Sequence, residues 1–360
     1  MINLRIPGPT PCPEEVLREM SRQMINHRGP EFAQLIGDIT TKLKIVCQTE
    51  NDVILLTGAG TGGLEAAIVN TLSQGDKVLA ISIGVFGDRF ASIARSFGAQ
   101  VIPLQFEWGT AADPGRIRQE LKANPEVKAV LVTHNETSTG VTNDLETIST
   151  LVKEADKLLL VDAVSSLSSI DIPIDRWHLD VVVSASQKGW MVPPGLAVVT
   201  VSQRAWQANS SAMMPRFYWD FAKAKSYLEK GQTPWTPAVS LFFALGKALD
   251  MILGEGLENV FSRHARLAQQ TRDGLRAIGI KLFADPDHAS KTVTSAIIPE
   301  DVDGKRLLKI LREKYNIVLS GGQQKLEGKI FRIGHMGWVS DKDIDEVLNG
   351  LSMALPEARG

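Results

Sequence analysis

The stretch that decides the fold is Val53-Ile-Leu-Leu-Thr-Gly-Ala-Gly-Thr-Gly-Gly63. A short apolar run comes first, a glycine-rich turn follows, and the helix-like segment 64–72 comes next. Strand, tight turn and helix in that order open a βαβ unit. Free backbone N–H groups at the start of a helix form an anion site, so the turn is either a phosphate-binding loop or a purely structural bend.

The same alternation continues from about residue 50 to residue 200. Most of the apolar runs are four to six residues long and rich in β-branched side chains, which is typical of strands covered on both faces. The runs are 53–57, 77–81, 101–104, 129–132, 158–161, 181–183 and 196–200, and helix-like segments lie at 64–72, 89–97, 117–123 and 145–155. This order predicts an α/β fold with a mostly parallel sheet between helices. No helix separates the last two runs, so one edge of the sheet is expected to be antiparallel.

The remainder of the chain predicts a second, smaller unit. Residues 237–278 are helical in pattern, with a break at Gly254 and Gly256. A smaller α+β pattern follows, at residues 292–298, 304–315, 317–319, 329–333 and 342–355. We therefore expect an extended N-terminal arm at 1–20, in the small lobe or at a dimer contact. A large domain at 21–255 and a small C-terminal domain at 256–360 should follow it.

Composition excludes several classes of protein. The chain has 360 residues, 44% hydrophobic and 22% charged, and a formal net charge of −2, so a nucleic-acid surface or a polybasic membrane contact is not expected. The only cysteines are Cys12 and Cys47, and no Cys/His cluster suggests a metal. The start of the chain lacks the pattern of a signal peptide, and no apolar run approaches the roughly 20 residues that span a bilayer. A cytoplasmic globular protein without membrane contact is expected.

Two charged residues follow predicted strands. Asp162 comes directly after the run 158–161, at the strand end where ligands bind in open α/β sheets. A carboxylate there could ion-pair with a protonated pyridine nitrogen, or it could simply cap a turn. Lys188 follows the run 181–183 among small residues, a setting that would desolvate its amine and lower the pKa enough for attack on an aldehyde.

The glycine turn also fits a dinucleotide-binding fingerprint. That interpretation needs an acidic residue about 20 positions further on, at the end of the next strand. The next strand ends Ala80-Ile-Ser-Ile-Gly84 and carries none. A nicotinamide oxidoreductase is therefore the minor interpretation.

Four motifs in order resemble the class V aminotransferases, which use pyridoxal phosphate. They are Gly58-Ala-Gly-Thr61, Thr133-His-Asn-Glu-Thr-Ser-Thr-Gly140, Val161-Asp-Ala-Val164 and Ser186-Gln-Lys188. The likeness extends from Pro7-Gly-Pro-Thr-Pro11 to Lys329–Gly337 and is greatest to the alanine:glyoxylate and serine:glyoxylate (serine:pyruvate) aminotransferases. It implies the fold type I architecture of aspartate aminotransferase and a homodimer with shared active sites. The substrates would be a small amino acid and a 2-oxo acid.

The resemblance also implies a role for individual residues. Lys188 is similar to the Schiff-base lysine, which is the catalytic residue, and Asp162 to the partner of the pyridine nitrogen. The other cofactor contacts implied are Val164 and Phe86 on the two ring faces, Thr137 near the ring oxygen, Gly60, Thr61 and Gln187 at the phosphate, and Thr236 reaching the phosphate of the other subunit. Arg332 and Gly8 are implied to bind the substrate, and Arg332 would bind the carboxylate of the substrate.

Some positions depart from the mammalian pattern of this family. Phe86 replaces a tryptophan, Ala59 a serine and Thr61 a histidine, and Gln232 stands where a tyrosine is frequent. These changes leave the implied chemistry intact but weaken inference about the phosphate contacts and the substrate. His134, His335 and Glu136 lie next to the motifs and are interpreted as structural.

Alternative functions remain open from the sequence. A cysteine desulfurase needs a reactive thiol in the last third of the chain, where no cysteine lies. A lyase-type pyridoxal-phosphate reaction on the same fold is compatible with the motifs. So is a non-catalytic subunit, since some bacterial relatives are named as a soluble hydrogenase small subunit.

Overall fold

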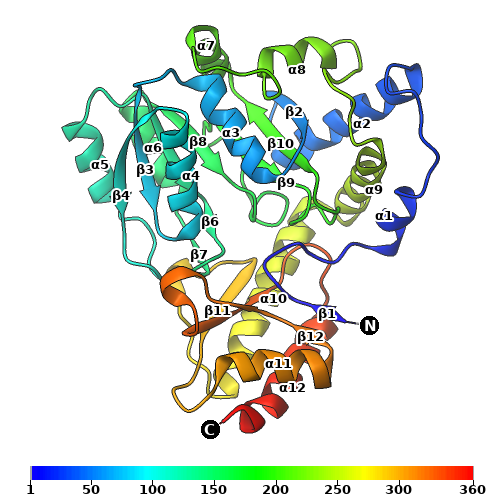
Figure 1. Ribbon diagram of the computed structural model, residues 1–360, viewed down its shortest axis with the longest axis vertical. Coiled ribbons are helices and arrows are strands. Elements are labelled where there is room, and N and C mark those ends of the chain that lie inside the picture. Colours follow the sequence, from blue (N-terminus) through cyan, green and yellow to red (C-terminus); the bar gives the residue numbers. More distant parts are fainter. Residues whose placement is uncertain (1, 360) are drawn as a thin grey trace.

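The computed structural model describes residues 2–359 and has two bodies of unequal size. Figure 1 shows a large α/β body, with a smaller α+β body below it that holds the C-terminal part of the chain. The N-terminal segment lies against the smaller body, where β1 (Asn3–Leu4) pairs in parallel with β12 (Ile317–Val318). The division at residues 20 and 255 stays a prediction, and Met1 and Gly360 lie outside the described residues.

A seven-stranded sheet forms the centre of the large body. Its order is β2 (Asp52–Thr57), β10 (Leu196–Val201), β9 (Val181–Ala185), β8 (Leu158–Asp162), β5 (Ala129–Thr133), β3 (Lys77–Ser82) and β4 (Gln100–Gln105). β10 alone runs opposite to the other six strands. The expected antiparallel strand therefore exists, but it lies one position in from the edge, because β2 pairs along its outer side.

Helices cover both faces of this sheet, as the continuous apolar runs predicted. One face packs against α3 (Gly60–Thr71), α4 (Val85–Ser96), α7 (Gln203–Ser211) and α8 (Phe221–Leu228). The other packs against α2 (Pro30–Cys47), α5 (Pro114–Ala123), α6 (Leu145–Glu154) and α9 (Val239–Glu255). Successive residues of β8 alternate between the two cores: Leu159 and Val161 face one, Leu160 the other.

The smaller body is a three-stranded sheet backed by helices. Its strands are β11 (Val293–Ile297), β14 (Ile330–Gly334) and β13 (Ser320–Gly321), and its helices are α10 (Leu257–Ala277), α11 (Gly304–Tyr315) and α12 (Asp341–Ala358). Gly256, with φ +85°, separates α9 from α10 at the predicted break. Short elements complete the chain: α1 (Glu14–Glu19), which packs on α9, and the hairpin of β6 (Asn135–Glu136) and β7 (Val141–Thr142).

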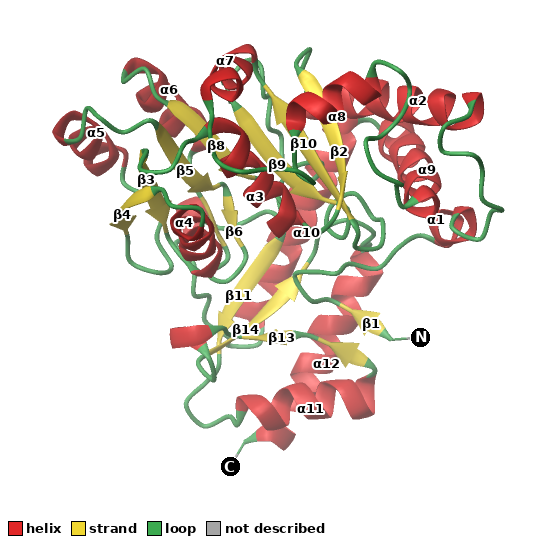
Figure 2. Ribbon diagram, turned by 45° about the horizontal axis from the view of Figure 1, so that its top comes forward, coloured by secondary structure: helices red, strands yellow, loops and turns green. Residues whose placement is uncertain are grey.

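The parallel strands direct their carboxyl ends toward the smaller body (Figure 2). Asp162 ends β8 and pairs with Thr133 at the end of β5, while Lys188 follows the end of β9. The fold therefore brings the predicted residues to one edge of the sheet, where the two bodies meet. Among residues 2–359, no helix combines the length and apolar character needed to cross a membrane.

Helix α3 begins earlier than the sequence indicated, at Gly60 instead of Leu64. Its glycines allow the helix to lie close to the sheet: a Cβ added to Gly63 would be 2.6 Å from Val183 Cγ1 and 3.1 Å from Ala197 Cβ. Such an approach excludes a larger side chain at this position, because packed interiors have no spare room.

Gly63→Ala should therefore destabilise the protein by about 1–3 kcal/mol through overpacking. The matched control is Gly37→Ala on the exposed side of α2, where an added Cβ meets nothing within 4 Å. That substitution should raise stability by up to about 1 kcal/mol through helix propensity. Urea midpoints of the three proteins measure both effects, and equal shifts for the two variants would contradict the packing argument.

Candidate active site

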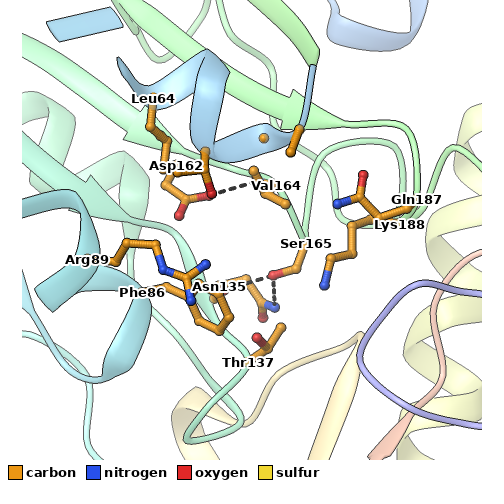
Figure 3. A pocket seen from close by; sticks show the side chains of 13 residues that line it. Leu64, Phe86, Arg89, Asn135, Thr137, Asp162, Val164, Ser165, Gln187 and Lys188 are labelled. Carbon is orange, nitrogen blue, oxygen red and sulfur yellow. Dashed lines mark hydrogen bonds between the residues drawn. The ribbon is translucent and has the colours of Figure 1, made fainter. Parts of the chain in front are cut away.

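One cavity collects most of the predicted residues. It lies at the carboxyl edge of the large sheet, and Figure 3 shows its lining side chains from close by. Eight predicted residues line it, namely Gly60, Thr61, Phe86, Thr137, Asp162, Val164, Gln187 and Lys188. They come from five separate segments of the chain. Only tertiary folding brings them together.

The start of α3 forms one end of the cavity. Within the described chain, the backbone N–H groups of Gly60 and Thr61 donate to no protein acceptor, as expected for the first turn of a helix. Gln187 also lines the cavity, and the N–H groups of its side-chain amide could donate to an anion. A Cβ on Gly60 would lie 2.8 Å from Val164 Cγ2 and would fill the space between helix and cavity wall. This end is suited to an anion such as a phosphate.

Asp162 provides the acidic group of the cavity. Its Oδ1 accepts a hydrogen bond from Val164 N at 3.0 Å, and its Oδ2 accepts one from Thr133 Oγ1 at 3.4 Å. Burial raises the pKa of this carboxyl to about 6, against the opposing effects of the Val164 hydrogen bond and of Lys188. The carboxylate lacks a close ion-pair partner in the described chain, so a cationic ligand group would be its natural partner.

Lys188 lies on another wall of the same cavity (Figure 3). Its Nζ donates a hydrogen bond to the carbonyl oxygen of Pro7 at 2.5 Å. Burial lowers the pKa of the amine to about 8. Asp162 opposes this shift, and Arg332 and Arg89 add to it. A much larger fraction of this amine is neutral near pH 7 than of an exposed lysine, and the neutral amine is the form that attacks carbonyl carbon.

The side walls are apolar and hydroxyl-bearing. Val164 and Phe86 line the cavity, and the guanidinium of Arg89 lies 4.7 Å from the centre of the Phe86 ring. Thr137 is buried in the loop after β6. A flat aromatic ring would fit between an aliphatic and an aromatic wall, with the acid, amine and anion site around it. The residues present therefore fit pyridoxal phosphate.

Arg332 comes from the smaller body and lies beside the cavity. Its Nη1 donates to Thr137 O at 3.0 Å and to Gln323 Oε1 at 3.2 Å, and its Nε donates to Gly321 O at 2.9 Å. Burial lowers the pKa of the guanidinium to about 10, so it stays charged near neutral pH. Gln323 therefore accepts from the guanidinium group that the resemblance assigns to a substrate carboxylate.

Gly8 and Thr236 occupy different positions relative to the cavity. Gly8 packs on the Lys188 side chain, since an added Cβ would lie 2.5 Å from Nζ. Thr236 is exposed and lines a separate surface hollow with Tyr218 and Trp235, so it does not reach the cavity of its own chain. A contact of Thr236 with a cofactor would have to be made in another subunit.

Sequence reasoning missed three polar residues that line the cavity: Arg89, Asn135 and Ser165. Arg89 follows Phe86 by three positions on α4, a spacing that places both on one helix face and could have revealed it. Asn135 and Ser165 bond to each other, at 2.8 Å from Asn135 Nδ2 to Ser165 Oγ. They lie inside or beside the motifs, where only the fold shows which side chains face inward.

Hydrogen bonds hold the neighbouring polar residues in place, which agrees with their structural interpretation. The carboxylate of Glu136 accepts from the backbone N–H groups of Phe86, Gly87 and Ser138. His134 and His335 bond to the hydroxyls of Ser166 and Thr294, and burial lowers their pKa values to about 4 and about 3. Glu136 therefore joins its own loop to the first turn of α4. Neither histidine carries charge near pH 7.

Known proteins are similar to this chain in sequence and in fold. The chain is 44% identical over 357 residues to the "Soluble hydrogenase, small subunit" of Synechococcus sp., covering 98% of this chain and 93% of that protein. It is 39% identical over 365 residues to the serine–glyoxylate aminotransferase of Methylorubrum extorquens, covering 98% and 90%. The crystal structure of alanine–glyoxylate aminotransferase from Nostoc sp. superposes with a TM-score of 0.95 at 33% identity, over 98% of this chain and 95% of that one.

These likenesses cover nearly the whole chain and agree with the fold type I architecture expected from the motifs. The family profile described as "Aminotransferase class-V" matches residues 2–340, which include every segment that builds the cavity. The chain belongs to the class V aminotransferase family.

Proposed function

We propose that this protein transfers the amino group of a small amino acid, serine or alanine, to a 2-oxo acid such as glyoxylate or pyruvate. The observation that carries the proposal is the desolvated amine of Lys188 in one cavity with the buried carboxylate of Asp162. Pyridoxal phosphate is the cofactor of the family. The names of the serine–glyoxylate and alanine–glyoxylate relatives support the substrate class.

The residues present divide the work of holding the cofactor. The phosphate would be held by the N–H groups of Gly60 and Thr61 and by Gln187, and the ring by Val164 and Phe86. Asp162 would keep the ring nitrogen protonated, and Thr137 would lie near the ring oxygen. When bound, pyridoxal phosphate supplies an aldehyde for Lys188 and a ring that withdraws electrons.

The chain itself must bind the substrate and move a proton. Arg332 would bind the amino-acid carboxylate after release of Gln323, and Gly8 would line the same position next to Lys188. Once released from the cofactor, Lys188 Nζ would be the base that takes the proton from the substrate Cα and delivers it to the former aldehyde carbon of the cofactor. The second half-reaction would run in reverse with the 2-oxo acid, and the same amine would move the proton. This order implies ping-pong kinetics.

Two rival functions have less support. A lyase would use the same lysine and acid, and product analysis separates it from a transaminase. A non-catalytic role, suggested by the name of the hydrogenase relative, would leave the lowered pKa of Lys188 and the free N–H groups of Gly60 and Thr61 without a purpose. A cytoplasmic location also stays a proposal, tested by cell fractionation.

Lys188→Ala should abolish covalent attachment of the cofactor and reduce transamination by at least about 10²-fold, because the nucleophile and the base are lost together. The wild-type holoenzyme should show a visible absorption band that borohydride removes. Amino-acid donors tested with glyoxylate and with pyruvate should yield the matching oxo acid and glycine or alanine. Full activity of the variant would contradict the assignment, and loss of carbon dioxide or ammonia without a new amino acid would favour a lyase.

The attachment of pyridoxal phosphate to the cofactor-free protein should depend on pH through Lys188. Only the neutral amine attacks, and the pKa of Lys188 is lowered to about 8, so the rate should rise up to about pH 8 and level off above it. Stopped-flow absorbance over a pH series measures the midpoint. A rate that keeps rising toward pH 10.5, the ordinary value for lysine, would show that the amine is solvated.

A homodimer is also proposed, supported by an aromatic patch of Phe217, Tyr218 and Trp235. The Phe217 side chain is 72% exposed, and its ring stacks on Trp235 with centres 4.8 Å apart. The patch adjoins the phosphate end, because the neighbouring Trp219 packs against Gly58 and Gly62 before and within α3. Thr236 lies in the hollow beside it. A second subunit covering the patch could carry Thr236 to the other cavity.

Phe217→Arg should convert the dimer to a monomer and lower the affinity for pyridoxal phosphate, since a buried interface would have to admit a charge. Met353→Arg, at an exposed apolar residue of α12 in the smaller body, is the control. Light scattering gives the mass, and cofactor titration gives the affinity. A wild-type protein of one-chain mass would refute the shared site.

A further inference from the structure

Within the N-terminal arm, residues 5–10 cross from the smaller body to the loop that carries Lys188. The carbonyl oxygen of Arg5 accepts from Gly334 N at 2.7 Å, at the end of the strand that carries Arg332. At its other end, Thr10 N donates to Gln187 O at 3.1 Å and Thr10 Oγ1 to Lys188 O at 3.0 Å. The arm is thus fixed on both sides of the Lys188 amine.

Close packing leaves the middle of the arm little freedom to move. A Cβ on Gly334 would be 2.2 Å from Ile6 O, and one on Gly337 would be 3.2 Å from Thr10 Oγ1. Gly8 has φ +132°, a conformation that favours glycine, and an added Cβ there would be 2.5 Å from Lys188 Nζ and 2.8 Å from its Cε. The absence of a side chain at Gly8 gives the amine access to Pro7 O.

We propose that the carbonyl oxygen of Pro7 is the resting acceptor of Lys188 Nζ, which the amine occupies whenever it is not bonded to the cofactor. A neutral amine has two N–H groups and one lone pair. When one N–H is donated to Pro7 O, rotation about the Cε–Nζ bond is restricted. The direction of the lone pair is then restricted as well. Pro7 and Gly8 are therefore positioning residues for the base, and the inference rests on the proposed function.

The arrangement also connects the two bodies. The arm is bonded to β14, two residues after Arg332, and the same arm aims the amine. A shift of β14 on binding of a substrate carboxylate would move Pro7 O relative to Lys188. The position of Arg332, which binds the substrate, and that of Lys188, which deprotonates it, are thus linked through residues 5–10 of the backbone, in addition to the contacts between the bodies.

Gly8→Ala tests the proposal through binding of two cofactor forms. Pyridoxamine phosphate leaves Lys188 free, as in the cofactor-free protein, so loss of the Pro7 bond and any backbone strain cancel in its Kd. Pyridoxal phosphate bonds to Lys188, so the cofactor-free state alone carries both the lost hydrogen bond and the contact of the added Cβ with Nζ. The ratio of Kd for pyridoxamine phosphate to Kd for pyridoxal phosphate should therefore rise about fivefold to tenfold over wild type. Thr10→Val, described below, adds no atom next to the amine and therefore separates the two effects.

Lys188→Ala provides the control background. There the same Gly8→Ala change should leave the ratio unaltered, because no amine is present to lose its acceptor. Thr10→Val, which removes the hydroxyl that fixes the arm to Lys188 O, should change the ratio in the same direction by a smaller factor, and Thr10→Ser should restore it. This pair decides the matter if Gly8→Ala does not fold.

The outcomes separate the two proposals. A ratio equal to wild type in Gly8→Ala, or in Thr10→Val if only that protein folds, overturns the role of Pro7 and leaves the transaminase assignment intact. An equal rise in the Lys188→Ala background also overturns it, since the effect would then not pass through the amine. Wild-type protein that binds neither cofactor form would instead refute the proposed function.

Discussion

The site depends on the burial of an amine and a carboxyl in one cavity without a direct ion pair between them. Desolvation moves the pKa of Lys188 down from 10.5 to about 8 and that of Asp162 up from 3.8 to about 6. Burial disfavours the charged form of each, and each charge partly restores that of the other. A ligand that brings a cationic ring nitrogen to the acid and an aldehyde to the amine relieves both penalties together.

The sheet makes this burial possible. Because β5, β8 and β9 are parallel, their carboxyl ends lie at one edge, where Asp162 ends β8 and the segments after β5 and β9 carry Thr137 and Lys188. Helices on both faces hold the strands rigidly through two apolar cores. The smaller body and the N-terminal arm contribute contacts at this edge, through Arg332 on Thr137 and Pro7 on Lys188, and the buried amine and carboxyl have shifted pKa values.

Much of the arrangement could be predicted from local sequence. The strands were found because their runs are apolar and short, and Lys188, Asp162 and the glycine turn were found because each follows such a run. The position of β10 within the sheet was not predicted, because strand order follows from long-range pairing. Arg89 was missed because its helix begins at Val85, four residues before the expected start. The hydrogen bond between Lys188 and Pro7 joins residues 181 positions apart, a separation at which local pattern has no information.

The sequence by itself determined which chemical groups are available and which of them follow strands, because the period of apolar residues and the placement of glycine are local properties. Tertiary structure alone decided which groups lose water, which remain without a hydrogen-bond partner and which share a cavity. Thr236 shows the difference: the resemblance implies a contact with the phosphate of the other subunit, and only the folded chain shows that Thr236 is exposed and away from the cavity of its own chain. Desolvation is a property of everything packed around a group, so it appears only when the distant segments are in place.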